Sequence, residues 1–255
     1  AQRAVLTSWI LVTVSSVSLL YLILSDDFRI SYVVSRSNAA LPLIYKFAAW
    51  WGGQEGSLLF WTWILASYSF IAVYTARKKH AGMISYVVAI MMTIQAFFLI
   101  LIVFIADPFQ VLMSGPQITS TPDGQGLNPL LQHPIMAIHP PMLYLGYVGF
   151  SVPFAFALAA LLTNRMDADW IRATRRWTLF PWGCLSIAIV LGGRWAYMEL
   201  GWGGYWGWDP AEYEFVWVSG VWRRPPQDMV WLPGDWVSHD GGYAWISGAW
   251  VEEGN

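Results

Sequence analysis

The residues with the clearest chemical potential are the aromatic side chains and glycines at positions 202–212, which read WGGYWGWDPAE. Glycine lets a backbone approach a ligand closely, and tryptophan and tyrosine combine a flat apolar face with a polar edge. This combination suits a large planar amphipathic ligand such as a porphyrin. The candidate binding residues are Trp202, Gly203, Gly204, Tyr205, Trp206, Trp208 and Asp209. An aromatic belt at a membrane surface is the alternative, although a belt does not require glycine.

His139 is the candidate metal ligand, and His133 lies six residues before it. Imidazole is the usual axial ligand of haem iron, and we expect His139 at the outer mouth of a membrane helix, where its nitrogen is accessible. The alternative is a histidine that hydrogen-bonds the unpaired backbone groups of a helix start.

Arg194 lies near the end of an apolar run, just before the aromatic segment. An arginine at that depth usually has a partner. It is a candidate to bind a propionate or a phosphate. The alternatives are an ion pair with Glu199 and an extended side chain that reaches the membrane surface.

The composition excludes several classes of protein. Hydrophobic residues make up 56% of the 255 residues and charged residues only 12%, whereas soluble domains carry about a quarter charged residues. This excludes a disordered chain and an ordinary cytosolic enzyme. The net charge of −2 gives no basic surface for a nucleic acid, and the one cysteine excludes an internal disulfide framework and a thiolate zinc cluster.

Five apolar stretches are long enough to cross a bilayer, which takes roughly 20 residues per helix. The predicted spans are residues 4–24, 57–76, 83–106, 142–162 and 177–198. The first has no small-residue cleavage signal, so it is interpreted as a spanning helix and not as a signal peptide. We predict an all-α polytopic membrane protein with a short outer Trp-rich segment and a small β-repeat C-terminal tail.

Lys and Arg residues predict the orientation, because they concentrate in cytoplasmic loops. Basic residues follow the second span at Arg77, Lys78 and Lys79, and more lie between 165 and 176, whereas residues 107–141 contain none. The predicted topology has a cytoplasmic N-terminus and a C-terminus on the outer side. The loops 25–56 and 107–141 then face outward as well.

A repeat occupies the end of the chain. Trp-x-x-Gly-x-Trp units begin at Trp217, Trp231 and Trp245, with a spacing of 14 residues, and turn-like residues separate them. Before them, Asp209-Pro-Ala-Glu212 has the composition of a helix start. The predicted domains are a transmembrane part (1–198), an outer aromatic segment (199–212) and a repeat tail (213–255).

The segment from Trp202 to Glu212 resembles the tryptophan-rich WWD signature of the haem-handling proteins of cytochrome c biogenesis. Four other stretches resemble the CcmF/NrfE type of haem lyase subunit. Three begin at Trp50 (WWGGQEGS), Leu127 (LNPLLQ) and His139 (HPPMLYLGYV), and the fourth runs from Trp182 to Glu199. The resemblance covers roughly residues 1–212, in order along the chain.

This resemblance implies haem binding and handling in cytochrome c-type biogenesis, as part of the haem lyase that attaches haem to apocytochrome c. The WWD segment would hold a non-covalent, b-type haem in transit, with His139 as an axial ligand. The implied location is the bacterial inner membrane, with the C-terminus periplasmic. The implied partners are haem, a periplasmic haem chaperone, apocytochrome c, the other maturation subunits and membrane lipid.

The chain departs from the family pattern after Glu212. Family members continue into helices that carry a second periplasmic histidine, whereas the tail here resembles small YXWGXW-repeat proteins. We therefore expect weak, exchangeable haem binding and no complete ligation by this chain alone. The alternative function is a truncated or chimeric membrane protein that acts as a non-catalytic interaction module through its aromatic tail. A transporter is disfavoured because the spans contain almost no ionisable residue beyond Arg194.

Overall fold

The computed structural model describes residues 2–76, 81–114, 117–164 and 169–199, together with residues 229–232, 235–239, 242–246 and 249–252. Two compact units divide the chain, Ala1–Glu199 and Leu200–Asn255. The first unit contains the helices and the second contains the four C-terminal strands, and each is described by itself.

The first unit is helical. Its α-helices are α1 (Gln2–Leu24), α2 (Ser31–Arg36), α3 (Leu43–Ala49), α4 (Gln54–Ala76), α5 (Ala81–Phe104), α6 (Pro134–Gly149), α7 (Ser151–Leu162) and α8 (Asp169–Glu199). A short 3₁₀ helix, η1 (Pro129–Leu131), precedes α6. Two strands of two residues each, β1 (Met113–Ser114) and β2 (Gln117–Ile118), pair antiparallel between α5 and η1.

The described residues contain five helical segments long and apolar enough to span a membrane, which confirms the predicted number. They are Gln2–Leu24, Gln54–Ala76, Gly82–Phe104, Pro134–Leu162 and Trp170–Glu199. The apolar stretches fix these helices because lipid leaves backbone groups no outside hydrogen-bond partner.

The fourth span begins earlier than predicted, and this corrects the position of His139. We expected a helix from residue 142 with His139 at its mouth, but α6 begins at Pro134 and His139 lies inside it. His133 caps the helix, because its Nδ1 accepts a hydrogen bond from the backbone N–H of Ile135 at 3.1 Å. Pro134 suits the first helical position because its missing N–H would have no partner there. The helix then continues through Pro140 and Pro141, against the rule that proline ends a helix.

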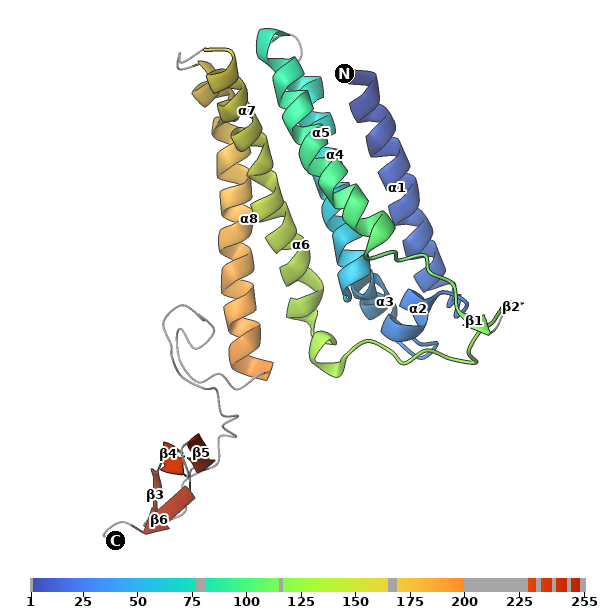
Figure 1. Ribbon diagram of the computed structural model, residues 1–255, viewed down its shortest axis with the longest axis vertical. Coiled ribbons are helices and arrows are strands. Elements are labelled where there is room, and N and C mark those ends of the chain that lie inside the picture. Colours follow the sequence, from blue (N-terminus) through green and yellow to red (C-terminus); the bar gives the residue numbers. More distant parts are fainter. Residues whose placement is uncertain are drawn as a thin grey trace. The chain divides into compact units, whose positions relative to one another are not determined.

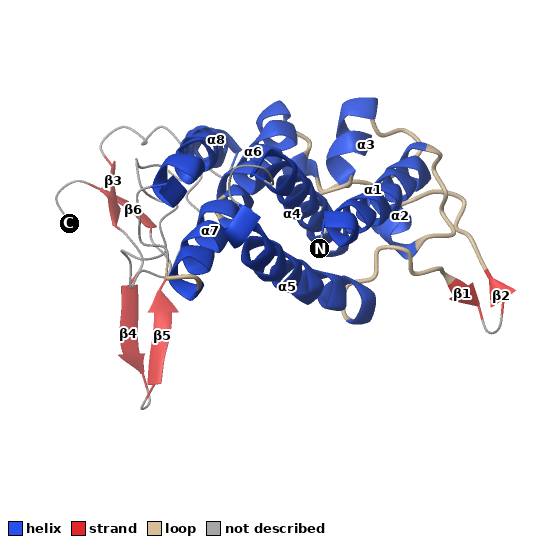
Figure 2. Ribbon diagram, turned by 90° about the horizontal axis from the view of Figure 1, so that it is seen from above, coloured by secondary structure: helices blue, strands red, loops and turns tan. Residues whose placement is uncertain are grey.

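The helices form a bundle in which α4 is central, with contacts to α1, α5 and α6 (Figure 2). The N-terminus of α1 and the C-terminal end of α7 lie at one end of this bundle, and α2, α3 and β1 lie at the other (Figure 1). The two loops predicted to face outward therefore lie at the same end of the bundle.

Polar side chains connect the apolar helices at three places. Trp9 Nε1 in α1 donates to Ser67 Oγ in α4, and Trp63 Nε1 in α4 donates to Thr13 Oγ1 in α1, each at 3.1 Å. The buried Gln95 in α5 donates through Nε2 to Ser8 Oγ at 2.7 Å. Such bonds fix the relative position of helices where lipid provides no hydrophobic driving force between them.

The two loops predicted to face outward are joined by backbone hydrogen bonds. Ser31 N–H donates to Gln110 O at 2.9 Å, Leu112 N–H to Arg29 O at 2.8 Å, and Gln125 N–H to Val34 O at 2.7 Å. Lys46 of α3 pairs with Asp26 just after α1, with Nζ–Oδ2 at 2.5 Å. The loops thus cover one end of the bundle as a single layer.

Glycines bring α6 close to α8. A Cβ atom at Gly146 would lie 2.9 Å from the Cα and the N of Leu185, and one at Gly149 would lie 2.5 Å from Cγ of Pro181. By contrast, a Cβ atom at Gly183 in α8 would have no neighbour within 4 Å. Small residues at such positions let membrane helices approach each other closely.

The described residues of the second unit form four short strands. They are β3 (Met229–Leu232), β4 (Asp235–His239), β5 (Gly242–Ile246) and β6 (Ala249–Glu252). β3 pairs antiparallel with β6 and β4 with β5, with Trp231 opposite Trp250 and Trp236 opposite Trp245 in register. The predicted repeat tail and its likeness to YXWGXW proteins stay predictions, and the helix start predicted at 209–212 lies outside the described residues.

We expect Gly146→Ala to destabilise the bundle, because the added methyl group would meet the backbone of Leu185, which cannot rotate away. Overpacking costs about 1–3 kcal/mol, which corresponds to a fall of about 2–10 °C in the thermal midpoint of a chain this size. Thermal unfolding of the detergent-purified chain measures the change. Gly183→Ala is the matched control, and its midpoint should be equal to or higher than that of the unmodified chain.

A second prediction concerns the buried ion pair in the outer layer. Lys46→Met removes the partner of Asp26, whose side chain is only 28% exposed, and we expect a loss of about 1–3 kcal/mol in the free energy of unfolding. Arg29→Met is the control, because the Arg29 side chain is 64% exposed whereas that of Lys46 is 9% exposed. Asp27 also retains a hydrogen bond after this change, since its Oδ1 accepts from the backbone N–H of residue 29. Equal loss in the two variants would contradict this assignment.

Candidate functional site

The candidate site lies at the end of α6 and α8 that adjoins the outer loops. Of the described elements, α6 and α8 make the most extensive contact. His139 lies in the second turn of α6, and α8 ends at Glu199, three residues before the predicted aromatic segment. The candidate ligand His139 and the nearby His133 both lie at this end.

His139 is oriented by the backbone of α8. Its Nδ1 lies 2.8 Å from the carbonyl oxygen of Ala188. A carbonyl oxygen only accepts, so Nδ1 carries the proton and donates, which leaves Nε2 with its lone pair in the neutral ring. No described residue hydrogen-bonds Nε2. A histidine whose second nitrogen is held in this way is in the form that binds a metal.

His133 has the opposite tautomer. Its Nδ1 accepts from the Ile135 N–H, so the proton of the neutral ring is on Nε2, which lies 3.6 Å from Oε1 of Glu199. Neither nitrogen then offers a free lone pair. The role considered as an alternative for His139, hydrogen bonding at a helix start, is performed by His133.

The ring of His139 rests on Gly192. A Cβ atom at position 192 would lie 2.6 Å from Cε1 of the ring and 3.0 Å from Nδ1. Further along α8, Trp195 Nε1 donates to the carbonyl oxygen of Leu130 at 3.2 Å. Sequence analysis missed Ala188, Gly192 and Trp195. A glycine inside a helical apolar run indicates close packing, and this signal was available at Gly192.

Arg194 is exposed on α8. Glu199, the acidic residue considered as its partner, faces His133 instead, and the ion pairs found among the described residues do not include Arg194. The ion pair between Arg194 and Glu199 that was considered as an alternative is therefore not found among the described residues. Its role toward an anionic group stays a prediction.

The predicted aromatic platform, Trp202, Gly203, Gly204, Tyr205, Trp206, Trp208 and Asp209, lies outside the described residues. Its part in ligand binding stays a prediction. The last described residue before it, Glu199 at the end of α8, faces His133, with Oε1 3.6 Å from Nε2.

A second cluster of aromatic residues lies within the described part of the chain. Trp50 contacts Phe60 of α4 with ring centroids 4.8 Å apart, and Phe60 contacts Tyr144 of α6 at 5.6 Å. Trp61 contacts the same Tyr144 at 5.9 Å. This cluster joins the WWGG stretch of the sequence to the helix that carries His139.

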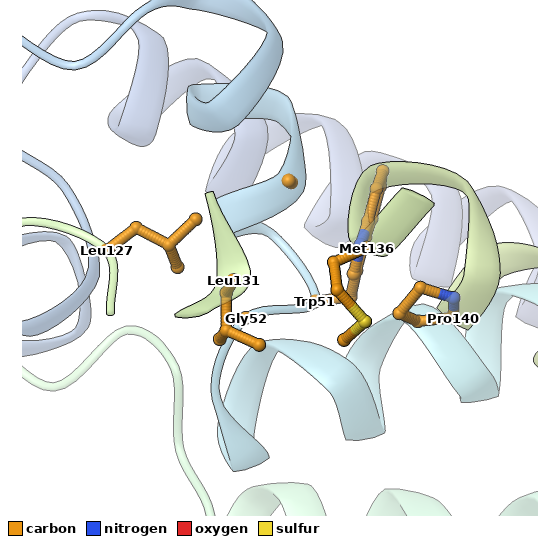
Figure 3. Close-up of a pocket in the computed structure, with 7 residues that line it drawn as sticks. Trp51, Gly52, Leu127, Leu131, Met136 and Pro140 are labelled. Carbon is orange, nitrogen blue, oxygen red and sulfur yellow. The ribbon is translucent and has the colours of Figure 1, made fainter. Parts of the chain in front are cut away.

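A cavity of about 50 Å³ lies on a neighbouring face of α6 (Figure 3). Met136 and Pro140 line it from α6, close in sequence to His139, and the other lining residues are Ala48, Trp51, Gly52, Leu127 and Leu131. The residues are almost all apolar. The cavity has the size of a small hydrocarbon group and offers no charged ligand.

This arrangement suits an iron that brings its own equatorial ligands. No group of three His, Cys, Asp or Glu residues that could hold a bare metal ion is found among the described residues. His139 offers one imidazole nitrogen that no described residue hydrogen-bonds. A porphyrin iron needs only axial ligands from the protein, so a single imidazole nitrogen is compatible with haem.

Comparisons with known proteins agree with this chemistry. The Cytochrome C assembly protein family matches residues 51–217. The cytochrome c-type biogenesis protein CcmF of Pseudomonas aeruginosa is 53% identical over 190 residues, which cover 74% of this chain and 28% of that protein. CcmF of Escherichia coli is 46% identical over 187 residues (73% and 28%), and NrfE of Haemophilus influenzae is 42% identical over 214 residues (83% and 33%).

A solved structure of the Cytochrome c Heme Lyase CcmF is similar in fold, with a TM-score of 0.66 and 34% identity over 82% of this chain and 32% of that one. The chain thus spans about a third of the length of the relatives it matches. The family match covers more than half of this chain, and five helices here can span a membrane. The chain therefore belongs to the cytochrome c assembly protein family, as a multi-pass membrane protein homologous to bacterial CcmF.

Proposed function

We propose that this chain binds haem in transit and forms part of the haem lyase that attaches haem to apocytochrome c. The observation that carries the proposal is the bond from His139 Nδ1 to the Ala188 carbonyl, because it leaves Nε2 free to ligate iron. The relatives named CcmF and the solved haem lyase support the reaction class.

The residues have distinct roles in this proposal. His139 would supply one axial ligand, and the residues Trp202–Asp209 would bind the porphyrin, as the resemblance implies. Arg194, exposed on α8, pairs with a haem propionate. Haem, the substrate, supplies the vinyl groups to which the cysteine thiols of apocytochrome c add. The residues of this chain bind and orient it and do not themselves react.

We place the chain in the bacterial inner membrane, with the N-terminus cytoplasmic and the C-terminus periplasmic. The basic residues after α4 and α7 support this orientation, and so does the absence of lysine and arginine from residues 107–141, which lie toward the other end of the bundle (Figure 1). The loop 25–56 at that end carries Arg29, Arg36 and Lys46, which count against this orientation but do not outweigh the other loops. A periplasmic haem chaperone, apocytochrome c and the other maturation subunits would then meet the site from the periplasm.

A second role concerns the tail at 213–255, as an interaction surface for a partner protein. The in-register tryptophans of the paired strands support it, because cross-strand aromatic pairs stabilise short sheets. Comparing proteins captured by the full chain and by its Trp231→Ala/Trp250→Ala variant tests this role. Identical capture would contradict it.

We expect His139→Ala to weaken haem binding about tenfold or more and to change the Soret band, because the axial nitrogen is lost. Haemin titration of the detergent-purified chain, followed by absorbance, measures both. His133→Asn is the matched control. Asparagine retains a cap for α6, and His133 Nε2 is protonated and not a ligand, so the Soret band should be unchanged.

Two results would contradict this assignment. If the haem titration curves of His139→Ala and of the unmodified chain superimpose, His139 is not a ligand. If the Soret band is lost in His133→Asn but kept in His139→Ala, then His133 and not His139 is the ligand.

We expect this chain alone to leave cytochrome c maturation at background level in a bacterial strain that lacks its own haem lyase. Haem held ready for transfer normally has axial ligands on both faces, and the described part of the outer site offers one free imidazole nitrogen. Covalent haem staining of a reporter cytochrome c measures this, with the full-length host protein as the positive control. Strong staining would show that this chain suffices.

A further inference from the structure

Gly192 is the residue of α8 on which the imidazole of His139 rests. The three atoms nearest to a Cβ built at this position all belong to that ring, at 2.6 Å (Cε1), 3.0 Å (Nδ1) and 3.2 Å (Nε2). The distance of 2.6 Å is shorter than real Cβ contacts, and the other two are tight, so a side chain at position 192 would displace the ring. The ring of His139 can therefore pack against α8 at this point because Gly192 has no Cβ atom.

The position of Gly192 along the helix explains how the ring reaches a backbone carbonyl. In an α-helix the carbonyl of residue 188 accepts from the N–H of residue 192, and a carbonyl oxygen has a second lone pair. Side chains tilt toward the helix N-terminus, so a side chain at 192 would cover the carbonyl of Ala188. Glycine leaves that second lone pair open to Nδ1 of His139 without opening the helix.

The two helices cannot separate to relieve such a clash without breaking other contacts. On one side of Gly192, Gly146 packs against the backbone of Leu185. On the other side, Trp195 donates to the Leu130 carbonyl and Glu199 faces His133. Because both sides are fixed, the ring of His139 is the part that would move.

We propose that Gly192 is a positioning residue for His139. It admits the imidazole to the Ala188 carbonyl, which fixes the proton on Nδ1 and leaves the lone pair of Nε2 for a ligand. The proposal rests on the proposed function, in which that lone pair binds haem iron. Gly192 differs here from Gly146 and Gly149, whose missing Cβ atoms admit a backbone segment and a proline, and from Gly183, which has open space around it.

The test compares Gly192→Ala with Gly183→Ala in the full chain in detergent. Both add one methyl group to a glycine of α8, but only the first meets His139. The first measurement is the tautomer of His139 in the haem-free protein, from ¹⁵N NMR of histidine-labelled samples, with its signals assigned by their loss in His139→Ala. The second is haemin titration.

We expect Gly192→Ala to lose the Nδ1–H signature of His139 and to weaken haem binding about 10–100-fold, the range typical of partners that orient a metal ligand. Gly183→Ala should retain both. An unchanged tautomer in Gly192→Ala would overturn the positioning role. An altered tautomer in Gly192→Ala, with haem affinity unaffected by His139→Ala, would overturn the proposed haem ligation and leave the positioning of the ring intact.

A double variant decides the case in which Gly192→Ala does not fold. Removing the ring in Gly192→Ala/His139→Ala makes room for the methyl group, so this variant should be as stable as His139→Ala and should bind haem with the same affinity. Recovery of folding in the double variant supports the coupling of Gly192 to the ring. A double variant that also fails to fold would show that Gly192 serves general helix packing, and would overturn the proposal.

Discussion

The close approach of α6 to α8 is the constraint on which the candidate site depends. Three glycines make it possible, because Gly146 meets the backbone of Leu185, Gly149 meets Pro181 and Gly192 meets His139. The first two set the distance between the helices. At that distance the third lets a side chain of one helix hydrogen-bond the main chain of the other, so one packing feature stabilises the bundle and orients the imidazole.

This contact also explains a helix that continues through two adjacent prolines. Pro140 and Pro141 have no N–H to donate to the carbonyls of Met136 and Ala137, so the outer turn of α6 lacks two of its own hydrogen bonds. Contacts outside the helix stabilise that turn instead. They include the cap by His133, the bond of His139 to Ala188, and the packing of Met136 and Pro140 near Trp51.

Composition and residue type predicted the membrane spans and the candidate ligand. The five spans follow from apolar length, and the candidate ligand His139 follows from residue type and from the resemblance of its HPPMLYLGYV stretch. The start of α6 was predicted eight residues late, because the span was drawn from the apolar stretch alone and the cap by His133 was not recognised. The short helices α2 and α3 and the role of Gly192 depend on contacts between residues distant in sequence, which no local pattern encodes.

His133 belongs to the site through its effect on helix placement and not through ligation. With a helix that began at residue 142, His139 would lie in a loop and no element would fix its ring. The cap by His133 starts α6 early enough to include His139, on the face that meets Ala188 and Gly192. The two histidines, six residues apart, thus have opposite tautomers, and both contribute to placing the ring of His139. Nδ1 of His133 accepts the hydrogen bond that caps α6. Nδ1 of His139 donates to α8, which leaves the lone pair of its Nε2 free.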